Sequence, residues 1–309
     1  MQDRMMRDRP RRLRRVQLSV PGSSEKMMAK AAASAADHVF LDLEDAVAPS
    51  AKAAARGKIV AALRTLEWGR KTRCVRINDL STRYAYEDII AVVEGAGEYL
   101  DTLMVPKVLS GKDVHFVATL LNQIEQKLGL GRRIGIEVLI EEVQALENVE
   151  EICRADGRLE CVIFGMGDYS ASQGIDIRSM ESQSPYPGDI WHYPRFRMIM
   201  AARAAGIDAV DGPYANFSNP GVFREECRRA NILGCVGKWA IHPAQIDIAL
   251  EVFTPTKAEV DRARRLAAAY AKAEAEGVGS VNVDGIMVDV ASVRILRSTV
   301  LKRADLIGM

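Results

Sequence analysis

The chain has 309 residues, of which 48% are hydrophobic and 27% are charged, a composition that allows either one large barrel or two smaller domains. The 42 Lys and Arg residues face 41 Asp and Glu residues, and the resulting net charge of +1 argues against the broad basic surface that nucleic-acid binding requires. No run approaches the ~18 uninterrupted apolar residues of a membrane span, so neither a nucleic acid nor a membrane is an expected partner.

The first 15 residues are the one strongly basic segment. They carry seven arginines against Asp3 and Asp8, and no apolar run follows them. This pattern excludes a secretory signal, and the segment lacks the Ser-rich, acid-poor character of a mitochondrial transit peptide. We interpret residues 1–15 as a solvated basic arm, with organelle targeting or a subunit contact as open alternatives.

Cysteine usage indicates a reducing compartment. The five cysteines form no C-x-x-C pair, and their number is odd; they are Cys74, Cys153, Cys161, Cys227 and Cys235. A disulfide framework or a zinc cluster is therefore not expected, and the cytoplasm is the expected location. Cys74 and Cys161 lie in apolar runs, which favours buried and inert thiols.

Short runs rich in Val and Ile recur along the chain between stretches with helical patterning. The runs cover residues 16–20, 39–43, 74–77, 102–106, 134–140, 161–165, 207–210 and 235–241. Eight strands that alternate with helices predict a TIM (β/α)₈ barrel over residues 16–255. An open doubly wound sheet is the rival fold, but no G-x-G-x-x-G motif follows any of the predicted strands.

The composition and the hydrophobic pattern of the sequence change after residue 255. Residues 256–276 are Ala-rich, charged and helical in pattern, and Gly277 and Gly279 then interrupt the helix. An extended stretch over 281–290 leads into a final helix. The segment is too long for a ninth barrel unit and too small for an independent domain, so we predict that residues 256–309 form a C-terminal lid.

Polar residues follow nearly every predicted strand. A barrel enzyme carries its active site at the carboxyl ends of its strands, so these residues are expected to share one rim. They are Asp42, Glu44, Asp45, Arg76, Asn78, Lys107, Glu141, Asp168, Asp211 and His242.

Glu141 and Asp168 are the expected metal ligands among these rim residues. They are 27 residues apart (168 minus 141), which is about the length of one strand-helix unit. This spacing places them at the ends of neighbouring strands. Mg²⁺ commonly binds one or two protein carboxylates and leaves coordination positions for substrate oxygens. The four histidines are scattered along the sequence and do not form a zinc-binding pattern. The alternative is that each acid merely caps the following helix.

Two further features suggest how an anionic substrate is held. Arg76 at the third strand end is suited to an enolate or a carboxylate, with an ion pair to the acids of the second strand as the compatible alternative. The turn at Gly22 and Ser23, followed by Lys26 and Lys30, is suited to phosphate groups. A simple turn with a helix cap explains the same turn equally well.

Several long motifs resemble one enzyme family over nearly the whole chain. They include VPGSSEKMMAKAAASAADHVFLDLEDAVAP, VRIN, PKV, IEVLIE, FGMGDYSAS, VDGPYANFSN and VGKWAIHPAQ. These segments resemble the citrate lyase β-subunit and malyl-CoA lyase family. The resemblance implies reversible aldol or Claisen-type cleavage of malyl-CoA, β-methylmalyl-CoA or citramalyl-CoA to an acyl-CoA and a 2-oxo acid such as glyoxylate or pyruvate.

The resemblance also implies roles for individual residues. Glu141 and Asp168 match the ligands of Mg²⁺, for which Mn²⁺ is an alternative, and Arg76 matches the arginine that steadies the thioester enolate. Lys30 falls where the family has a lysine near the CoA phosphates. Asp289 matches an acid that reaches the site of a neighbouring subunit in a homotrimer or hexamer. Glu44 and Asp45 are expected to lie next to the metal ligands and to orient them without binding the metal themselves.

Two departures leave the acyl-CoA undecided. Ser24 stands where malyl-CoA lyases tend to have a basic residue, and the segment 175–190 looks shorter than in those enzymes. A malyl-CoA thioesterase or malate-synthase-like activity is the nearest alternative. An acyl-carrier-dependent citrate lyase β-subunit is a further alternative, although relatives of that kind tend to be shorter at the C-terminal end.

Overall fold

The eight Val- and Ile-rich runs form eight parallel strands that close into a barrel, as predicted. The computed structural model describes residues 9–176 and 188–309. Strand β1 pairs with β2 on one side and with β8 on the other, where Val16 lies opposite Lys238, and this pairing closes the sheet. The strands are β1 (Val16–Pro21), β2 (His38–Asp42), β3 (Thr72–Arg76), β4 (Thr102–Val105), β5 (Gly135–Ile140), β6 (Leu159–Phe164), β7 (Asp208–Asp211) and β8 (Gly237–Ala240).

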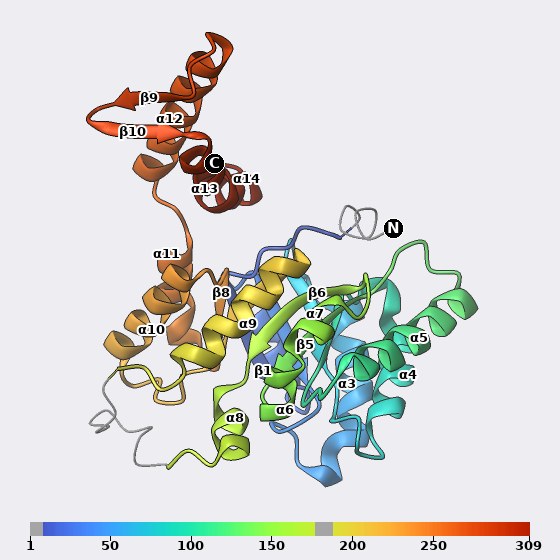
Figure 1. Cartoon of the computed structure of the whole chain (residues 1–309). Helices are drawn as coiled ribbons and strands as arrows, with labels where there is room; N and C mark the ends of the chain where they lie inside the picture. The colour runs from blue at the N-terminus through green and yellow to red at the C-terminus, as the bar shows by residue number, and fades with distance from the viewer. Residues whose placement is uncertain (1–8, 177–187) are drawn as a thin grey trace.

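Helices between the strands cover the outside of the barrel (Figure 1). Their apolar faces and the outward side chains of the strands form the main hydrophobic core. The helices are α2 (Glu25–Ala32), α3 (Lys52–Thr65), α4 (Ala85–Ala96), α5 (Gly111–Leu128), α6 (Val143–Glu147), α7 (Val149–Arg154), α8 (Met166–Gln173), α9 (His192–Ala205), α10 (Pro220–Leu233) and α11 (Ile246–Phe253), with short 3₁₀ turns at η1 (Pro49–Ala51), η2 (Gly97–Tyr99) and η4 (Pro243–Gln245).

Inward-facing side chains fill the barrel in layers, because successive residues of a strand point to opposite faces of the sheet. The middle of the barrel is apolar and contains Phe40, Cys74, Met104, Leu139, Cys161, Ile163, Val210 and Trp239. Two residues further along their strands, Asp42, Arg76 and Glu141 follow Phe40, Cys74 and Leu139. The period of two therefore places these three polar residues above the apolar layer, at the carboxyl-terminal rim.

The N-terminal arm closes the opposite, amino-terminal end of the barrel. Arg14 is only 2% exposed, and its guanidinium lies 3.1 Å from Glu137 Oε1, 2.8 Å from Glu160 Oε2 and 3.0 Å from Asp208 Oδ2. Arg12 also binds Glu160, at 2.7 Å. The expectation of a solvated arm is therefore wrong for these residues, because inward carboxylates at the barrel end bind them; residues 1–8 lie outside the described part.

The C-terminal residues form an appendage with a small core of its own. It comprises α12 (Lys257–Ala275), the antiparallel hairpin β9 (Ser280–Val283) and β10 (Ile286–Asp289), and the helices α13 (Val290–Leu296), η5 (Arg297–Leu301) and α14 (Lys302–Ile307). Leu266, Tyr270, Val288 and Val293 pack together away from the barrel core. The stretch predicted as one extended piece is thus a hairpin, because Asp284 and Gly285 turn the chain with positive φ.

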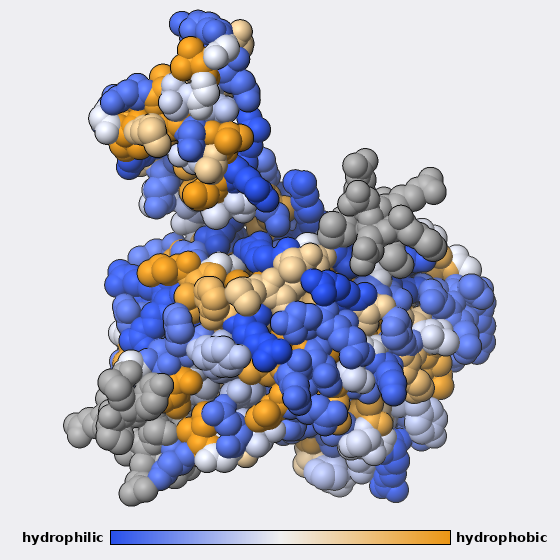
Figure 2. Space-filling model, in the orientation of Figure 1, coloured by the Kyte–Doolittle hydropathy of each residue, from blue (hydrophilic) through white to orange (hydrophobic). Residues whose placement is uncertain are grey.

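The appendage stands at the amino-terminal end of the barrel, opposite the helices α6 and α8 that follow the strand carboxyl ends (Figure 1). Arg303 of α14 donates to Cys235 O, and Lys302 lies 3.8 Å from Asp208 at the start of β7. Figure 2 shows apolar residues on its surface, and Met287, Val290 and Ile295 are each more than 60% exposed. In one isolated chain the appendage therefore leaves these apolar side chains uncovered.

All five cysteines are free thiols and are buried. Burial raises the pKa of the Cys74 and Cys161 thiols well above the usual value, which agrees with the expectation of inert thiols. Within the described residues, no helix is both long and apolar enough to cross a membrane.

Candidate active site

Arg76 connects the ends of β2 and β3 at the carboxyl-terminal rim. Its Nε and Nη2 donate to the two carboxylate oxygens of Asp42 at 2.7 and 2.6 Å, and Nη1 lies 2.8 Å from Glu44 Oε2. Burial alone would lower the pKa of Arg76, but Asp42 and then Glu44 raise it above the usual value. The ion pair with the acids of the second strand is therefore formed, and the guanidinium is a fixed positive charge.

Two aromatic rings hold the Arg76 guanidinium in place from inside the barrel. Its central carbon lies 5.3 Å from the ring centre of Trp239 and 5.9 Å from that of Phe40, and the two rings meet edge to face. Cation–π contacts of this kind favour one orientation of the planar group. Arg76 is 4% exposed, and these rings and the acids Asp42 and Glu44 surround its guanidinium.

Lys107, after β4, binds two acids of the rim with different atoms. Its backbone N–H donates to Glu141 Oε1 at 2.8 Å, and its Nζ donates to Glu44 Oε1 at 2.5 Å. The backbone of Lys107 is left-handed, with a φ of 49°, a conformation that few non-glycine residues adopt. This conformation turns the N–H toward Glu141, so the β4 turn fixes the carboxylate.

Carboxylates are crowded at the end of β5. Burial first, and then the charges of Glu44 and Asp168, raise the pKa of Glu141 to about 8. Burial and the neighbouring Asp45 raise the pKa of Glu44 to about 7, although Arg76 and Lys107 oppose the shift. Such crowding disfavours the ionised acids unless further positive charge is present.

Asp168 reaches the same rim from the first turn of α8, which begins directly after β6. The turn passes very close to Glu141: a Cβ atom on Gly165 would lie 2.5 Å from both Cβ and Oε2 of Glu141. Glycine is therefore needed at position 165. The capping alternative is wrong for Glu141, whose carboxylate accepts the Lys107 N–H instead of capping a helix.

Other predicted rim residues are not part of this cluster. Asp211 is fully buried between Arg195 of α9 and Lys238 of β8, at 2.8 and 2.7 Å. It follows the inward-facing Val210 by one residue, so the strand alternation points it outward to the helices. His242 caps η4 and stacks on Phe217. Asn78 accepts a hydrogen bond from Lys52 behind the rim.

Lys26 and Lys30 are exposed on α2, the helix that follows β1. Ser24 is the N-cap of this helix and accepts a hydrogen bond from the Met27 N–H, so the capping role falls one residue after the predicted Ser23. Lys58 of α3 donates to Ser23 O at 3.1 Å. Lys26 and Lys58 therefore lie near the start of α2, whereas Lys30 belongs to its last turn.

Asp289 lies far from these residues within one chain. It is the N-cap of α13 in the appendage, where its Oδ1 accepts from the backbone N–H and the hydroxyl of Ser292, both at 2.8 Å. These hydrogen bonds lower the pKa of Asp289. Because the appendage stands at the amino-terminal end of the barrel, Asp289 does not meet the rim of its own chain.

The rim donors fit a hard divalent cation. The acids Glu141, Asp168 and Glu44 offer only oxygen, and their mutual repulsion would be relieved by two positive charges. Among the described residues, a different group places its potential ligand atoms within 4.8 Å of one another: His38, Cys74 and Glu137. There Glu137 already accepts from His38 and Arg14, and the Cys74 thiol stays protonated, so this interior group is a poor ligand set.

Several rim contacts carry no recognisable sequence signal. Nothing in the stretch around Lys107 indicates a left-handed backbone, and nothing around Lys52 indicates that its Nζ binds the carbonyl oxygens of Leu43 and Glu44. The Phe40–Trp239 pair could be read from strand parity alone, because both residues face inward. The structure brings Glu44, Asp45, Arg76, Glu141 and Asp168 together, as expected from the strand ends.

A closed (β/α)₈ barrel with buried, interacting charges at its carboxyl-terminal rim is the architecture of a barrel enzyme. Within that class, the chain belongs to the HpcH/HpaI aldolase/citrate lyase family, which matches residues 15–243. The resemblance seen in the motifs is thereby confirmed. The expectation of a carbon–carbon lyase is confirmed with it.

Named relatives agree with this assignment. The chain is 41% identical to an L-malyl-CoA/β-methylmalyl-CoA lyase of Cereibacter sphaeroides, with 97% of each chain covered. It is 34% identical to a (3S)-malyl-CoA thioesterase of the same species, with 92% of this chain and 93% of the relative covered. The protein CitE of Mycobacterium tuberculosis, solved with magnesium, acetoacetate and coenzyme A, has a TM-score of 0.73 at 28% identity, covering 94% of this chain and 97% of that one.

Proposed function

We propose that the protein cleaves a 3-hydroxyacyl-CoA, namely malyl-CoA, β-methylmalyl-CoA or citramalyl-CoA, reversibly to an acyl-CoA and a 2-oxo acid. The observation that carries the proposal is the rim cluster, in which Glu141 and Asp168 lie beside the buried and fixed Arg76. The 41% identity to a malyl-CoA/β-methylmalyl-CoA lyase over 97% of the chain supports the substrate class.

Mg²⁺, or Mn²⁺ in its place, is the proposed cofactor, with Glu141 and Asp168 as its ligands. Bound there, it would polarise the carbonyl group of a 2-oxo acid. Glu44 and Asp45 would support the ligands indirectly, since Glu44 binds both Arg76 and Lys107, which in turn contact Asp42 and Glu141.

Arg76 and Asp289 are the proposed catalytic residues. The Arg76 guanidinium would bind the thioester oxygen, where negative charge grows as the carbon–carbon bond breaks. Asp289, supplied by a neighbouring subunit of a homotrimer or hexamer, would exchange the proton at C2 of the acyl-CoA. Lys26, near the start of α2, and Lys30, in its last turn, would bind the CoA phosphates, since both side chains are exposed.

The cytoplasm is the proposed location, and five free, buried thiols support a reducing compartment. We propose no nucleic-acid or membrane partner, in line with the net charge of +1.

The proposal is tested by incubating the purified protein with Mg²⁺ and each of the three hydroxyacyl-CoA esters, and by identifying both products. We expect equal amounts of a 2-oxo acid and an acyl-CoA from at least one ester. The proposal is wrong if no ester yields a 2-oxo acid.

The ligand assignment is tested with Glu141→Gln, which keeps the size of the side chain and removes its charge. We expect kcat/KM to fall by about 100-fold or more, with the Mg²⁺ dependence lost. Glu142→Gln is the matched control, because this neighbouring side chain only flanks α6 and makes no capping hydrogen bond there. Equal metal titrations for the Glu141→Gln variant and the wild type would contradict the assignment.

A thioesterase is the second candidate, because the 34% identical relative is a (3S)-malyl-CoA thioesterase. Free CoA and malate without glyoxylate would identify that activity in the same assay. A requirement for an acyl-carrier partner, seen as no turnover of free CoA esters by the isolated protein, would instead favour the citrate lyase β-subunit alternative.

A further inference from the structure

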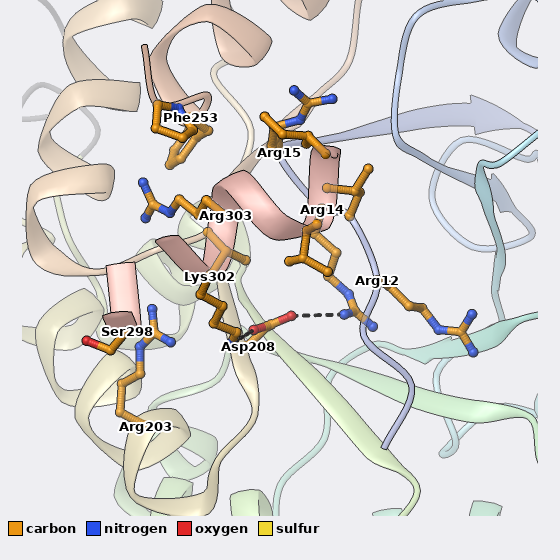
Figure 3. Close-up of a pocket in the computed structure, with 14 residues that line it drawn as sticks. Arg12, Arg14, Arg15, Arg203, Asp208, Phe253, Ser298, Lys302 and Arg303 are labelled. Atoms are coloured by element: carbon orange, nitrogen blue, oxygen red, sulfur yellow. Dashed lines mark hydrogen bonds and ion pairs between the residues drawn. The ribbon is translucent and has the colours of Figure 1, made fainter. Parts of the chain in front are cut away.

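A cavity lies at the end of the barrel opposite Glu141 and Asp168. It is bounded by the N-terminal arm, the starts of β7 and β8, and helix α14 of the appendage (Figure 3). Its volume is about 40 Å³, enough for roughly three water molecules, which is also the size of a small tetrahedral ion. Phe253 and Leu306 supply an apolar wall, and Arg203, Lys302 and Arg303 bring positive charge from two sides.

The positive charges around this cavity exceed the negative charge available to them. Within the described part of the chain, Asp208 is the one acid that lines the cavity, and it already binds Arg14 at 3.0 Å. Lys302 reaches the same carboxylate only at 3.8 Å. The other two cations bind neutral oxygens: Arg203 donates to Gly234 O, and Arg303 donates to Cys235 O and Asn231 Oδ1.

Arg303 is the most constrained of the three cations. It is held between the barrel and α14, and burial, followed by repulsion from Arg203, lowers its pKa. A partly buried guanidinium beside a like charge is less favourable when no anion lies near it. Among the described residues no carboxylate lies within 4.0 Å of either guanidinium, so neither has a close acidic partner.

We propose that this cavity binds a free inorganic oxyanion of the phosphate type between Arg203, Lys302 and Arg303. Guanidinium and ammonium donors from different elements line this cavity, and such donors match the several acceptor oxygens of a tetrahedral ion. The cavity volume of about 40 Å³ accommodates a free ion. Because Arg203 belongs to the barrel and the other two cations to α14, the ion ties the appendage to the barrel end.

The test is calorimetric titration of the full-length protein with inorganic phosphate, without divalent cations and at constant ionic strength. We expect one saturable site per chain, with binding weakened by about 10-fold or more in Lys302→Met and in Arg203→Met. Arg203 is exposed and Lys302 is partly exposed, so these variants are expected to fold. Lys257→Met is the matched control, because this exposed lysine of the appendage pairs with Asp261 and does not line the cavity.

Hydrogen exchange of α14 provides a second readout. Phosphate should slow exchange in the wild type and not in Lys302→Met, since the ion bridges α14 to the barrel. The proposal is overturned if phosphate binds with equal affinity to the wild type, Lys302→Met and Arg203→Met. It is also overturned if Lys30→Met alone abolishes binding, which would place the phosphate at α2, or if glycerol 3-phosphate binds and inorganic phosphate does not.

Discussion

At the scale of single residues, the position of Glu141 at the rim depends on close packing of the backbone around it as much as on charge. Glu141 is held between the left-handed Lys107, which donates its N–H, and Gly165, whose missing side chain leaves room for the carboxylate. A methyl group at position 165 would overlap Oε2 of Glu141. The geometry of the proposed ligand is therefore set by two residues that are not ligands themselves.

Gly165→Ala should accordingly weaken the proposed metal site. We expect the Mg²⁺ concentration for half-maximal activity to rise by about 10–100-fold, as is common when a group supporting a ligand is altered. Gly167→Ala is the matched control, because no atom lies within 4 Å of the added Cβ there. Equal metal titrations for the two variants would contradict the role of Gly165, and thermal melts would report any loss of fold.

Asp211 illustrates a buried charge with a structural role. Burial would raise its pKa, but Arg195 and Lys238 together lower it below the usual value. An unfolded aspartate titrates near pH 3.9, so the contribution of Asp211 to stability is fully present above about pH 4. It is lost as the pH falls through the lower pKa of the folded state.

Asp211→Asn should therefore destabilise the protein most at neutral pH. Removing one partner of a buried pair typically costs about 3–5 kcal/mol, and we expect the lower end because Lys238 keeps Glu226 at 2.8 Å. Urea unfolding between pH 3 and 7 measures the effect. The free-energy difference from the wild type should shrink toward pH 3, and a constant difference over the whole range would contradict this account.

At the scale of elements, the appendage combines a small core of its own with a proposed catalytic acid. Its small core of Leu266, Tyr270, Val288 and Val293 is separate from the barrel core, and its contacts to the barrel run through α14. Asp289 begins α13 at the end of the hairpin. The element therefore presents the acid on its own small scaffold.

Asp289→Asn separates the chemical role of this residue from its capping role. Asn caps helices about as well as Asp, so we expect the free energy of unfolding to change by less than about 1 kcal/mol. The loss of a general base should lower kcat by about 10²–10⁴-fold, with the KM for the acyl-CoA little changed. Asp284→Asn, in the exposed hairpin turn, is the control. Full turnover in the Asp289→Asn variant would contradict the proposed role.

At the scale of the whole molecule, the two halves of the proposed site lie at opposite ends of one chain. The rim of Glu141 and Asp168 is at the carboxyl ends of the strands, and Asp289 stands beyond the amino ends. A complete site therefore requires a second copy of the chain. Exposed Met287, Val290 and Ile295 on the appendage supply apolar surface suited to such a contact.

Mixing two inactive variants tests this arrangement directly. If Asp289→Asn and Glu141→Gln are co-assembled in equal amounts, a site with an intact rim from one subunit and an intact Asp289 from the next should form. Random assembly in a ring gives such pairs in roughly a quarter of the sites, so roughly a quarter of wild-type activity is expected. If the assembled mixture has no more activity than either variant alone, Asp289 does not act across subunits.

Sequence alone determined the barrel and the composition of its rim. The eight apolar runs specify buried parallel strands, and the strand ends identify Glu44, Arg76, Glu141 and Asp168 because a parallel barrel gathers its carboxyl ends. The change in composition after residue 255 likewise indicated the appendage, whose helices and hairpin follow from local sequence patterns.

Tertiary structure alone decided how these parts meet. It turned Asp211 outward to Arg195, buried Arg14 among acids that are more than 120 residues away, and brought Arg203 to Lys302 and Arg303. It also gave Lys107 the backbone conformation that fixes Glu141. These features depend on the approach of distant segments through space, whereas local sequence patterns report only the preferences of neighbouring residues.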